Sequence, residues 1–440
     1  MAEVLLGIDI GTSNTKAVIA HADGAVLATA QREHATSYPR PGFVEHDPEE
    51  IWWNDFTALT AELLEQADGP IAGVSVSGIG ACTLPADADG NPVRDAILYG
   101  VDTRAGEEID ELLDRYGESE ILERTLSAVS HGSVGPKLLW LQHHEPDVWE
   151  RTKQLLMPNS FIIERLTDEY TLDSISASFC IPMFDPRTRT WIDEWAEEVA
   201  PGLALPRVVE PWEEAGRISE RGAELTGLPA NIPICAGTID AFVESASVGV
   251  KEPGDVMLTY GTTMGIAGLV DEPVSSGTLN SKPGVFPGTH ILIGPTATSG
   301  AVTDWLRAVS DGKPFDSVRS IIETLSEASV PIERVVAVGG GTRGALWTQI
   351  VSDVTGLSQE LSEVTIGACY GDCLFAARAA GLIDNDTDWA THAEQVEPVA
   401  EHAELYDTLY RIYGELYPAT LSQSHELAKL QTEQGMVPDG

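Results

Sequence analysis

The chain opens with a strand, a short polar turn and a second strand, and this hairpin constrains the fold more than any other feature. Apolar residues from Leu5 lead into Asp9, a Gly-Thr-Ser-Asn turn covers residues 11–14, and a second strand runs over residues 15–20. A glycine lets the backbone approach a ligand closely, and N–H groups and hydroxyls of such a turn can point at an anion. Lys16 adds a point charge. The hairpin therefore predicts a phosphate-binding turn, with an ordinary polar hairpin as the alternative.

The carboxylate of Asp9 ends the first strand, immediately before the turn. Mg²⁺ binds through one or two carboxylates plus substrate phosphates and keeps several waters, so we expect Asp9 to hold this ion. The cysteines do not form a zinc pattern, because only Cys369 and Cys373 are close together. We expect all five to be buried thiols in a reducing cytoplasm.

The same pattern restarts in the second half of the chain. After a linker at residues 251–254, a strand (256–260), a Gly-Thr turn (261–265) and a second strand (266–270) repeat the opening order. This weak internal repeat predicts two domains, residues 1–250 and 251–440. Two such hairpins can face each other across a cleft and hold a polyphosphate from both sides.

Two later stretches add to this interpretation. A strand over 334–338 runs into three glycines, 339–341, before a helix that extends to residue 355. Backbone at a glycine turn before a helix suits the adenosine or α-phosphate of a nucleotide. A helix over 367–381 is rich in small residues and is expected to pack closely against a neighbour. Asp47 and Pro48 are expected to begin a helix with Ile51 and Phe56 on its apolar face.

The chain is strongly acidic, with 26 basic and 69 acidic residues and a net charge of −43. Such a surface repels nucleic acid and anionic membranes, which excludes both as partners. High salt would screen the self-repulsion, so we hypothesise a cytoplasmic protein of a salt-accumulating, halophilic organism. No apolar run is long enough to span a membrane, and the acidic N-terminus is unlike a signal peptide.

A series of motifs, in this order, resembles the FGGY carbohydrate kinases of the sugar kinase, actin and Hsp70 superfamily. The motifs are the opening hairpin, Pro41–Pro48 before Trp52 and Trp53, Asp87–Pro92 before Asp102-Thr103-Arg104, Pro136–Leu141, Ala236–Ala241, Tyr260–Thr263 and Val338–Gly341. The resemblance covers most of the chain and implies an α/β fold of two actin-like (ribonuclease H-like) domains with a nucleotide cleft between them. The xylulokinase-like branch is nearest. It implies ATP-dependent phosphorylation of a sugar or polyol, such as the pentulose xylulose, with ATP and Mg²⁺ as cofactors; a homodimer is compatible with it.

The resemblance also implies the roles of the site residues. Asp240 matches the family's catalytic base, which accepts the proton of a sugar hydroxyl during phosphoryl transfer; the structural alternative is a cap of the helix expected over 242–249. Asp9 would organise Mg²⁺. The phosphates would be held by Thr12, Ser13, Asn14 and Lys16 from one side and by Gly261, Thr262 and Thr263 from the other, with Gly340 and Gly341 at the adenosine. The substrate would be bound by Gly78, Ile79, Asp102, Arg104 and Asp240. A surface salt bridge is the alternative for Asp102 and Arg104.

The chain departs from the family pattern in two places. The turn at 79–82, Ile-Gly-Ala-Cys, lacks the polar groups from which a polyol-specific site is normally built, so the substrate need not be xylulose. The second domain is short between residues 307 and 334, where the family has several tens of residues more. A trimmed domain, an omitted segment and a loss of full activity all stay open.

Two other functions compete with the kinase. One is a superfamily ATPase that acts on a protein partner, which the cysteine spacing does not support. The other is a degenerate family member that binds ligand without turnover. Its support is the short second domain, and the presence of Asp9, Lys16 and Asp240 argues against it.

Overall fold

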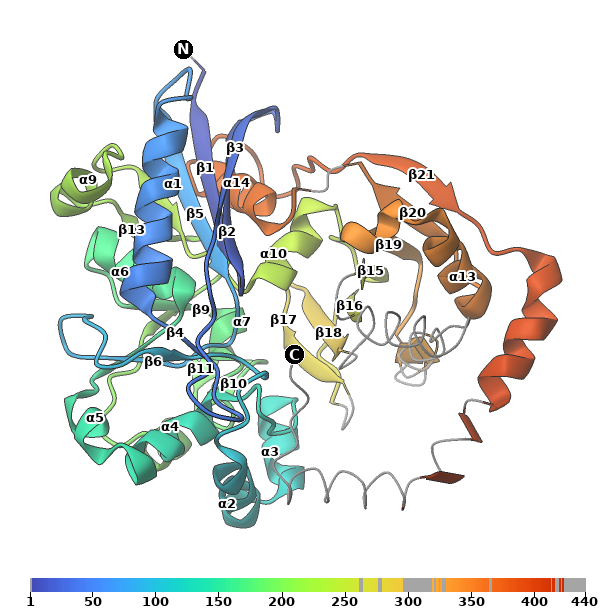
Figure 1. The fold of residues 1–440 in the computed structure, drawn as a ribbon, viewed down its shortest axis with the longest axis horizontal. Coiled ribbons are helices and arrows are strands. Elements are labelled where there is room, and N and C mark those ends of the chain that lie inside the picture. The colour runs from blue at the N-terminus through green and yellow to red at the C-terminus, as the bar shows by residue number, and fades with distance from the viewer. Residues whose placement is uncertain are drawn as a thin grey trace.

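A computed structural model of the protein describes residues 2–260, 264–275, 279–295, 330–363 and 366–412. It also describes the single residues 319, 322, 323, 325, 326, 414, 415, 419, 420 and 422. The predicted phosphate-binding residues Gly261, Thr262 and Thr263, and most of the short segment 308–334, lie outside these ranges. Within them the chain forms two large mixed sheets flanked by helices (Figure 1).

The first sheet is built from the first half of the chain, and its strand order is β13-β14-β5-β1-β2-β3. The strands are β1 (Val4–Ile10), β2 (Asn14–His21), β3 (Val26–Glu33), β5 (Ile71–Gly78), β13 (Glu214–Arg217) and β14 (Pro233–Cys235). The predicted hairpin is confirmed: β1 and β2 are antiparallel, with Asp9 opposite Lys16. β5 runs parallel to both β1 and β14.

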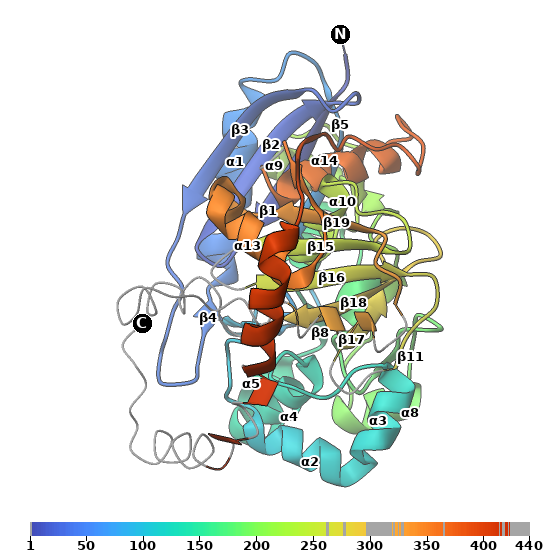
Figure 2. The same ribbon diagram turned by 90° about the vertical axis from the view of Figure 1, so that its right-hand side faces the viewer.

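The second sheet repeats this arrangement, in the order β17-β18-β16-β15-β19-β20-β21. The strands are β15 (Asp255–Tyr260), β16 (Met264–Val270), β17 (Asn280–Pro283), β18 (His290–Pro295), β19 (Arg334–Val338), β20 (Gln359–Ser362) and β21 (His392–Val396). β15 is antiparallel to β16 and parallel to β19, as β1 is to β2 and β5. The internal repeat read from the two hairpins is therefore present in the strand topology. Figure 2 shows β19, β15, β16 and β18 in succession.

The two faces of the first sheet are covered by different parts of the chain, because successive side chains of a strand point to opposite faces. Leu6 and Ile8 of β1 belong to one core with Phe56 of α1 (Asn54–Leu64) and Phe161 of α6 (Pro158–Thr167). Leu5 belongs to another core with residues of α14 (Ala368–Ala379).

Helix α14 comes from the second half of the chain yet packs on the first sheet (Figure 1). A Cβ on Gly7 would lie 2.1 Å from the carbonyl oxygen of Cys369, and one on Gly73 would lie 2.7 Å from that of Ala376. Gly371 meets α10 (Asp240–Ser247) in the same way, 2.4 Å from the carbonyl oxygen of Val243. The predicted close packing of this small-residue helix is confirmed. The domain boundary at 250/251 stays a prediction.

The predicted helix after Asp47 is present, but its first part, η1 (Pro48–Trp53), is a π-helix that continues into α1. Asp47 caps it as expected, since its side chain accepts from the N–H groups of Glu49 and Glu50 at 2.9 and 3.0 Å. One helix start was predicted wrongly. The helix expected from Phe242 begins at Asp240.

The remaining elements are short and surround the two sheets. The helices are α2 (Gly106–Tyr116), α3 (Glu118–Thr125), α4 (Val134–His144), α5 (Pro146–Arg151), α7 (Ser174–Ala177), α8 (Asp193–Val199), α9 (Glu220–Thr226), η2 (Gly340–Arg343), α13 (Ala345–Thr355) and η3 (Ala400–His402), with further helix over 403–412. The paired strands are β4 (Glu45–His46) with β7 (Ala96–Ile97), β6 (Leu84–Ala86) with β8 (Gln154–Leu156), β10 (Phe184–Asp185) with β11 (Thr190–Trp191), and β12 (Arg207–Val209) with β9 (Thr171–Asp173).

All five cysteines are free and buried, as the sequence predicts. In the described part of the chain, no helix is both long and apolar enough to cross a membrane.

Candidate active site

The parallel strands of the first sheet bring the predicted polar residues to one edge. Asp9, near the end of β1, lies opposite Ser77, near the end of β5. The backbone of Gly78 bridges that of Ile239, just before Asp240, and the N–H of Ile79 donates to the carbonyl of Ile10 at 2.9 Å. Ligands of α/β sheets bind at such carboxyl edges, so Asp9, Gly78, Ile79 and Asp240 share one candidate site.

The turn that carries Asp240 is held rigidly by buried polar groups. Gly237 has a φ of +59°, and a Cβ there would lie 2.0 Å from the carbonyl oxygen of Val76. The next residue, Thr238, donates to the buried Asp173 at 2.6 Å, and Asn159 donates to the other oxygen of Asp173 at 3.1 Å. This support fixes the start of α10. It was not predicted, because it joins residues far apart in the sequence.

Asp240 is the first residue of α10 and not its cap. The N-cap position belongs to Ile239, which forms no side-chain capping bond. Within the described residues, the carboxylate of Asp240 accepts only from the adjacent N–H of Ala241, at 2.7 Å. Asp240 is therefore not the N-cap residue, but its carboxylate accepts one N–H of the first turn of α10. Its other oxygen atom has no hydrogen bond within the described residues and can serve a ligand.

Several acidic groups of the site have raised pKa values because they are buried near one another. Burial raises the pKa of Asp240 to about 6, against the opposing effects of the Ala241 N–H and the charge of Lys16. Burial and the charge of Asp240 raise the pKa of Glu244, one turn along α10, to about 7. Burial, followed by the charges of Asp240 and Asp372, raises the pKa of Asp9 well above its ordinary value. The site therefore carries excess negative charge that a cation would stabilise.

The surroundings of Asp9 fit a Mg²⁺ ion. Its Oδ1 atom is buried and has no hydrogen-bond partner in the described part of the chain. Among the described residues, no group of three or more histidine, cysteine or acidic residues is arranged to hold a metal ion. An ion at Asp9 would thus need phosphate and water ligands as well, which is how Mg²⁺ usually binds.

Asp372 is a buried acid that the sequence analysis missed. It lies on α14, is 0% exposed, and accepts hydrogen bonds from Ser75 at 2.8 Å and Ser77 at 2.5 Å on β5. Burial raises its pKa to about 8, although the two serine hydroxyls lower it. Asp372 thereby ties the helix from the second half of the chain to the strand beside Asp9. The sequence held one signal for it, because Asp372 is the single acidic residue in the largely apolar segment 368–379.

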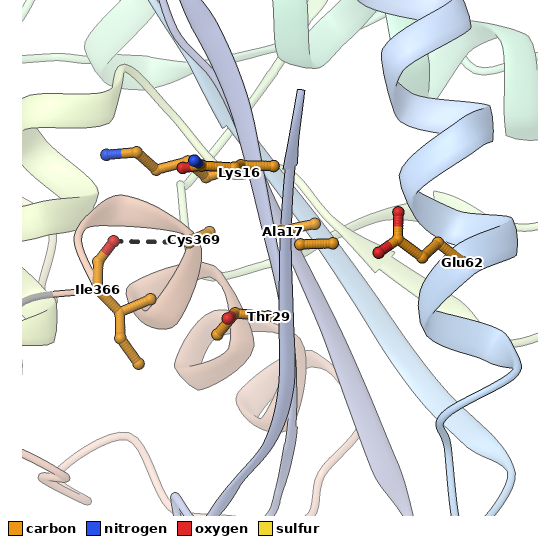
Figure 3. A pocket seen from close by; sticks show the side chains of 8 residues that line it. Lys16, Ala17, Thr29, Glu62, Ile366 and Cys369 are labelled. Carbon is orange, nitrogen blue, oxygen red and sulfur yellow. Dashed lines mark hydrogen bonds between the residues drawn. The ribbon is translucent and has the colours of Figure 1, made fainter. Parts of the chain in front are cut away.

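Two neighbouring pockets share Lys16. One of about 130 Å³ is lined by Lys16 and Glu244 together with Gly340 and Thr342 of the second half. Gly341 instead packs on Tyr260, whose Cβ would lie 2.9 Å from a Cβ added at Gly341. The second pocket, of about 580 Å³, runs along β2 and β3 to Cys369. Figure 3 shows that Lys16 points to the α14 side of β2, away from Glu62 on α1. Lys16 thus faces the predicted nucleotide turn of the second half.

The turn between β1 and β2 leaves its own donors free. The N–H of Gly11 donates to the carbonyl of Asn14 at 3.0 Å. The N–H groups of Thr12 and Ser13 form no hydrogen bond within the described residues. The side chain of Thr12 contacts the hydroxyl of Tyr99 at 3.2 Å. Two free N–H groups in one turn suit a phosphate.

Asp102 and Arg104 form a fully buried ion pair, with both side chains 0% exposed and 2.7 Å between Oδ2 and Nη2. The salt bridge named as the alternative is therefore present, but it is buried and does not lie at the surface. The pair organises the loop before β4, because Asp102 also accepts from the N–H of Val44 at 2.7 Å and Arg104 stacks on Phe43. Nη1 of Arg104 is buried without a partner in the described part of the chain, so one donor remains for a ligand. Contact with substrate stays a prediction for both residues.

Comparison with known proteins decides the family. The FGGY carbohydrate kinase N-terminal domain model matches residues 4–249, and the C-terminal domain model of the same family matches residues 257–380. The chain belongs to the FGGY family of carbohydrate kinases. It therefore has the two-domain fold of the actin-like ATPase superfamily and is a phosphotransferase, as its motifs implied. The comparisons favour neither of the two competing functions.

Individual FGGY relatives resemble the chain over most of its length. It is 22% identical to a xylulose kinase of Staphylococcus xylosus over 485 residues, covering 94% of this chain and 99% of that protein. It is 31% identical to a glycerol kinase of Nocardia farcinica over 326 residues, covering 70% of this chain and 63% of that protein. The crystal structure of a xylulose kinase from Rhodospirillum rubrum superimposes with a TM-score of 0.89 at 26% identity, covering 96% of this chain and all of that one.

The shortening of the second domain between residues 307 and 334 stays a prediction. The alignment with the S. xylosus enzyme extends over more residues than the 440 of this FGGY kinase, so the relative carries residues with no counterpart here.

Proposed function

We propose that this FGGY kinase phosphorylates a pentulose such as xylulose at the expense of ATP, with Asp240 as the general base. Relatives named xylulose kinase align with nearly the whole chain, which supports the substrate class. The observation that carries the proposal is the setting of Asp240. Its carboxylate lies at the carboxyl edge of the first sheet with a pKa raised to about 6, so it is ionised at neutral pH and still basic enough to accept a proton.

In this proposal the chain's own groups activate the hydroxyl and position the nucleotide. Asp240 takes the hydroxyl proton as the oxygen forms its bond to the γ-phosphorus and the bond to ADP breaks. Lys16 and the N–H groups of Thr12 and Ser13 bind the phosphates from the first domain. Asp9 holds Mg²⁺, which supplies positive charge against the phosphate oxygens. The unpartnered Oδ1 of Asp9 supports this role.

The second domain binds the rest of the nucleotide. The pocket that joins Gly340 to Lys16 and Glu244 supports a role for the glycine turn there. Gly261, Thr262 and Thr263 remain the expected phosphate-binding residues of the second hairpin. Closure of the two domains would exclude water, so that the phosphoryl group goes to the sugar.

The substrate is the least constrained part of the proposal. Ile79 is 3% exposed and belongs to a turn without polar side chains, and a relative with 31% identity is named glycerol kinase. Glycerol is therefore the main competitor of a pentulose.

A direct assay tests the proposed function. Purified protein in molar KCl with Mg·ATP is offered pentuloses, hexuloses, polyols including glycerol, and sugar acids, while ADP release is followed. Turnover confined to a pentulose supports the proposal, and turnover confined to glycerol corrects the substrate. Binding of ATP without release of ADP, whichever of these compounds is present, would contradict the proposed function.

The net charge of −43 and the five free cysteines support the proposal that this protein functions in a reducing, salt-rich cytoplasm. Repulsion among so many acidic side chains is weakest where salt screens it.

A further inference from the structure

Three backbone carbonyls of the phosphate turn, those of Gly11, Thr12 and Ser13, are held from one side by residues just after β3. The carbonyl of Gly11 lies 3.1 Å from Nε2 of His34, and that of Thr12 accepts from the hydroxyl of Thr36 at 2.8 Å. The carbonyl of Ser13 accepts from the backbone N–H of His34 at 3.0 Å. Because the carbonyls are held toward residues 34–36, the peptide N–H groups between them are left without partners for an anion.

The ring of His34 lies between two acceptors. Its Nδ1 is 2.8 Å from Oδ2 of Asp55, and its Nε2 faces the carbonyl of Gly11. Neither a carboxylate nor a carbonyl oxygen can donate, so both contacts are hydrogen bonds only when both ring nitrogens carry a proton. The side chains of His34 and Asp55 are 7% and 6% exposed, which leaves little access for water as a substitute partner.

His46 lies beside His34 but has the opposite bonding pattern. The indole N–H of Trp52 donates to its Nδ1 at 3.2 Å, so the proton of neutral His46 is on Nε2, which lies 3.2 Å from the hydroxyl of Thr36. Burial, followed by the charge of His34, lowers the pKa of His46 to about 4. His46 thus stays neutral and orients the hydroxyl that holds the Thr12 carbonyl.

Asp55, the carboxylate that faces His34, has further hydrogen-bond donors of its own. Asp55 also accepts from Thr15 at 2.9 Å and from Arg32 at 3.0 Å. Burial acts to raise the pKa of Asp55, but the bonds from His34, Thr15 and Arg32 outweigh it and leave that pKa below its ordinary value. Asp55 is therefore an ionised partner across the physiological range. The ring of His46, 5.3 Å away between centroids, carries no competing charge.

We propose that His34 is a positioning residue for phosphate binding, and that it holds the turn in its binding form only as the imidazolium paired with Asp55. This inference rests on the proposed function, because it assumes that Mg·ATP binds at the turn. Loss of the His34 proton removes the bond to Asp55 or the bond to Gly11. The turn is then held at fewer points and its N–H groups are less well oriented, so ATP binds more weakly as pH rises.

The test compares Mg·ATP dissociation constants of wild type and His34→Phe, by calorimetry across a pH series. At each pH we take the ratio of the dissociation constant of His34→Phe to that of wild type. Titration of ATP and of Asp9, Asp240 and Glu244 affects both proteins alike, so it cancels in this ratio. We expect His34→Phe to bind roughly tenfold more weakly at mildly acidic pH, as for loss of a charge-assisted hydrogen bond. The ratio should fall as pH rises, because the neutral ring of wild type keeps only one of the two hydrogen bonds that His34→Phe lacks.

Three further variants separate positioning from folding. His34→Gln keeps an amide donor without a titrating proton, so it should restore part of the affinity at every pH. Thr36→Val removes the hold on Thr12 alone, so it should weaken binding by a factor that does not change with pH. His21→Phe alters a histidine at the far end of β2 and should bind as wild type does.

Nitrogen NMR of the histidine rings gives an independent readout, and we expect both nitrogens of His34 to be protonated at mildly acidic pH. An unprotonated ring nitrogen there, or a His34→Phe ratio that is one or flat with pH, overturns this inference while leaving the kinase assignment intact. A wild type that does not bind Mg·ATP contradicts the proposed function, and this inference falls with it.

Discussion

At the scale of single residues, burial and charge set the chemistry of the site. Asp9, Asp240 and Glu244 lie near Lys16, and all three have raised pKa values. An arrangement that disfavours ionisation in the empty protein costs stability, and such costs are concentrated at functional sites. Bound Mg²⁺ would relieve this repulsion.

Replacing the proposed base tests its role. Asp240→Asn keeps the size and polarity of the side chain but cannot accept the proton. We expect kcat to fall by roughly 10²–10⁴-fold, with Mg·ATP affinity little changed. The matched control is Asp193→Asn, which alters the exposed first residue of α8, as Asp240 is the first of α10. Turnover of Asp240→Asn equal to that of the control would remove Asp240 from the mechanism.

The raised pKa of Asp240 also predicts the pH dependence of turnover. A base must be ionised to act, so activity should be present above its pKa and lost as pH falls through about 6. The acidic limb of a plot of kcat/KM against pH, where activity falls, measures this pKa in the free enzyme. A limb near the ordinary aspartate value, close to 4, would show that the buried site does not raise this pKa.

Part of the site was predictable because its residues follow a local pattern. Asp9, Lys16 and Asp240 lie next to turns that can be recognised in the sequence. Asp372 and Asp173 act through contacts with residues far along the chain, such as Ser75 and Thr238. No local spacing identifies such partners, so the fold was needed to find them.

At the scale of elements, α14 joins the two halves of the molecule. It packs on β1 and β5 of the first sheet and against α10, which begins with Asp240. The hairpin repeat predicted the two sheets, because strand-turn-strand order is local. It did not predict that a helix of the second half covers the first sheet. Small residues indicated a close contact without identifying the partner.

The contact at Gly7 should tolerate no side chain. In Gly7→Ala the new Cβ would lie 2.1 Å from a backbone carbonyl of α14, so the helix must shift. We expect the free energy of unfolding to fall by about 1–3 kcal/mol, measured by denaturant titration. Gly265→Ala is the control in β16, because a Cβ there meets nothing within 4 Å among the described residues. Equal stability of the two variants would mean that α14 does not pack this closely.

Asp372 should make stability depend on pH in a direction unusual for an acid. Its folded-state pKa is about 8, above the unfolded value near 4, so its contribution to stability is lost as pH rises between these values. We expect Asp372→Asn, which can still bond Ser75 and Ser77, to gain in Tm relative to wild type over this window.

Asp353 provides the opposite case. Burial acts to raise its pKa, but bonds from Val399, His402 and Gln349 lower it below the ordinary value. Asp353→Asn should therefore be less stable than wild type at neutral pH, and the difference should shrink as pH falls through the folded pKa. The stability of Asp372→Asn and that of Asp353→Asn, each relative to wild type, should change with pH in different ways. The same pH trend for both variants would contradict the buried, serine-bonded setting of Asp372.

At the scale of the whole molecule, the net charge of −43 dominates. Helices α2 and α3 show how the acids are distributed: Glu107, Asp110, Asp114, Glu118 and Glu120 are all exposed. Few cations lie between them, so the folded chain carries a self-repulsion that unfolding would relieve.

Salt should therefore stabilise the folded protein. At roughly 1 M salt the Debye length is about 3 Å, compared with about 30 Å at 0.01 M, so repulsion between neighbouring acids is largely screened. We expect Tm to rise steadily from dilute buffer to molar KCl, measured by calorimetry without ligands. A variant with these five acids of α2 and α3 replaced by glutamine carries less repulsion, so its Tm should start higher in dilute buffer and rise less with salt. If Tm rises equally steeply with KCl concentration in both proteins, the salt effect has a cause other than charge screening. A wild-type Tm that does not increase with KCl would refute adaptation to a salt-rich cytoplasm.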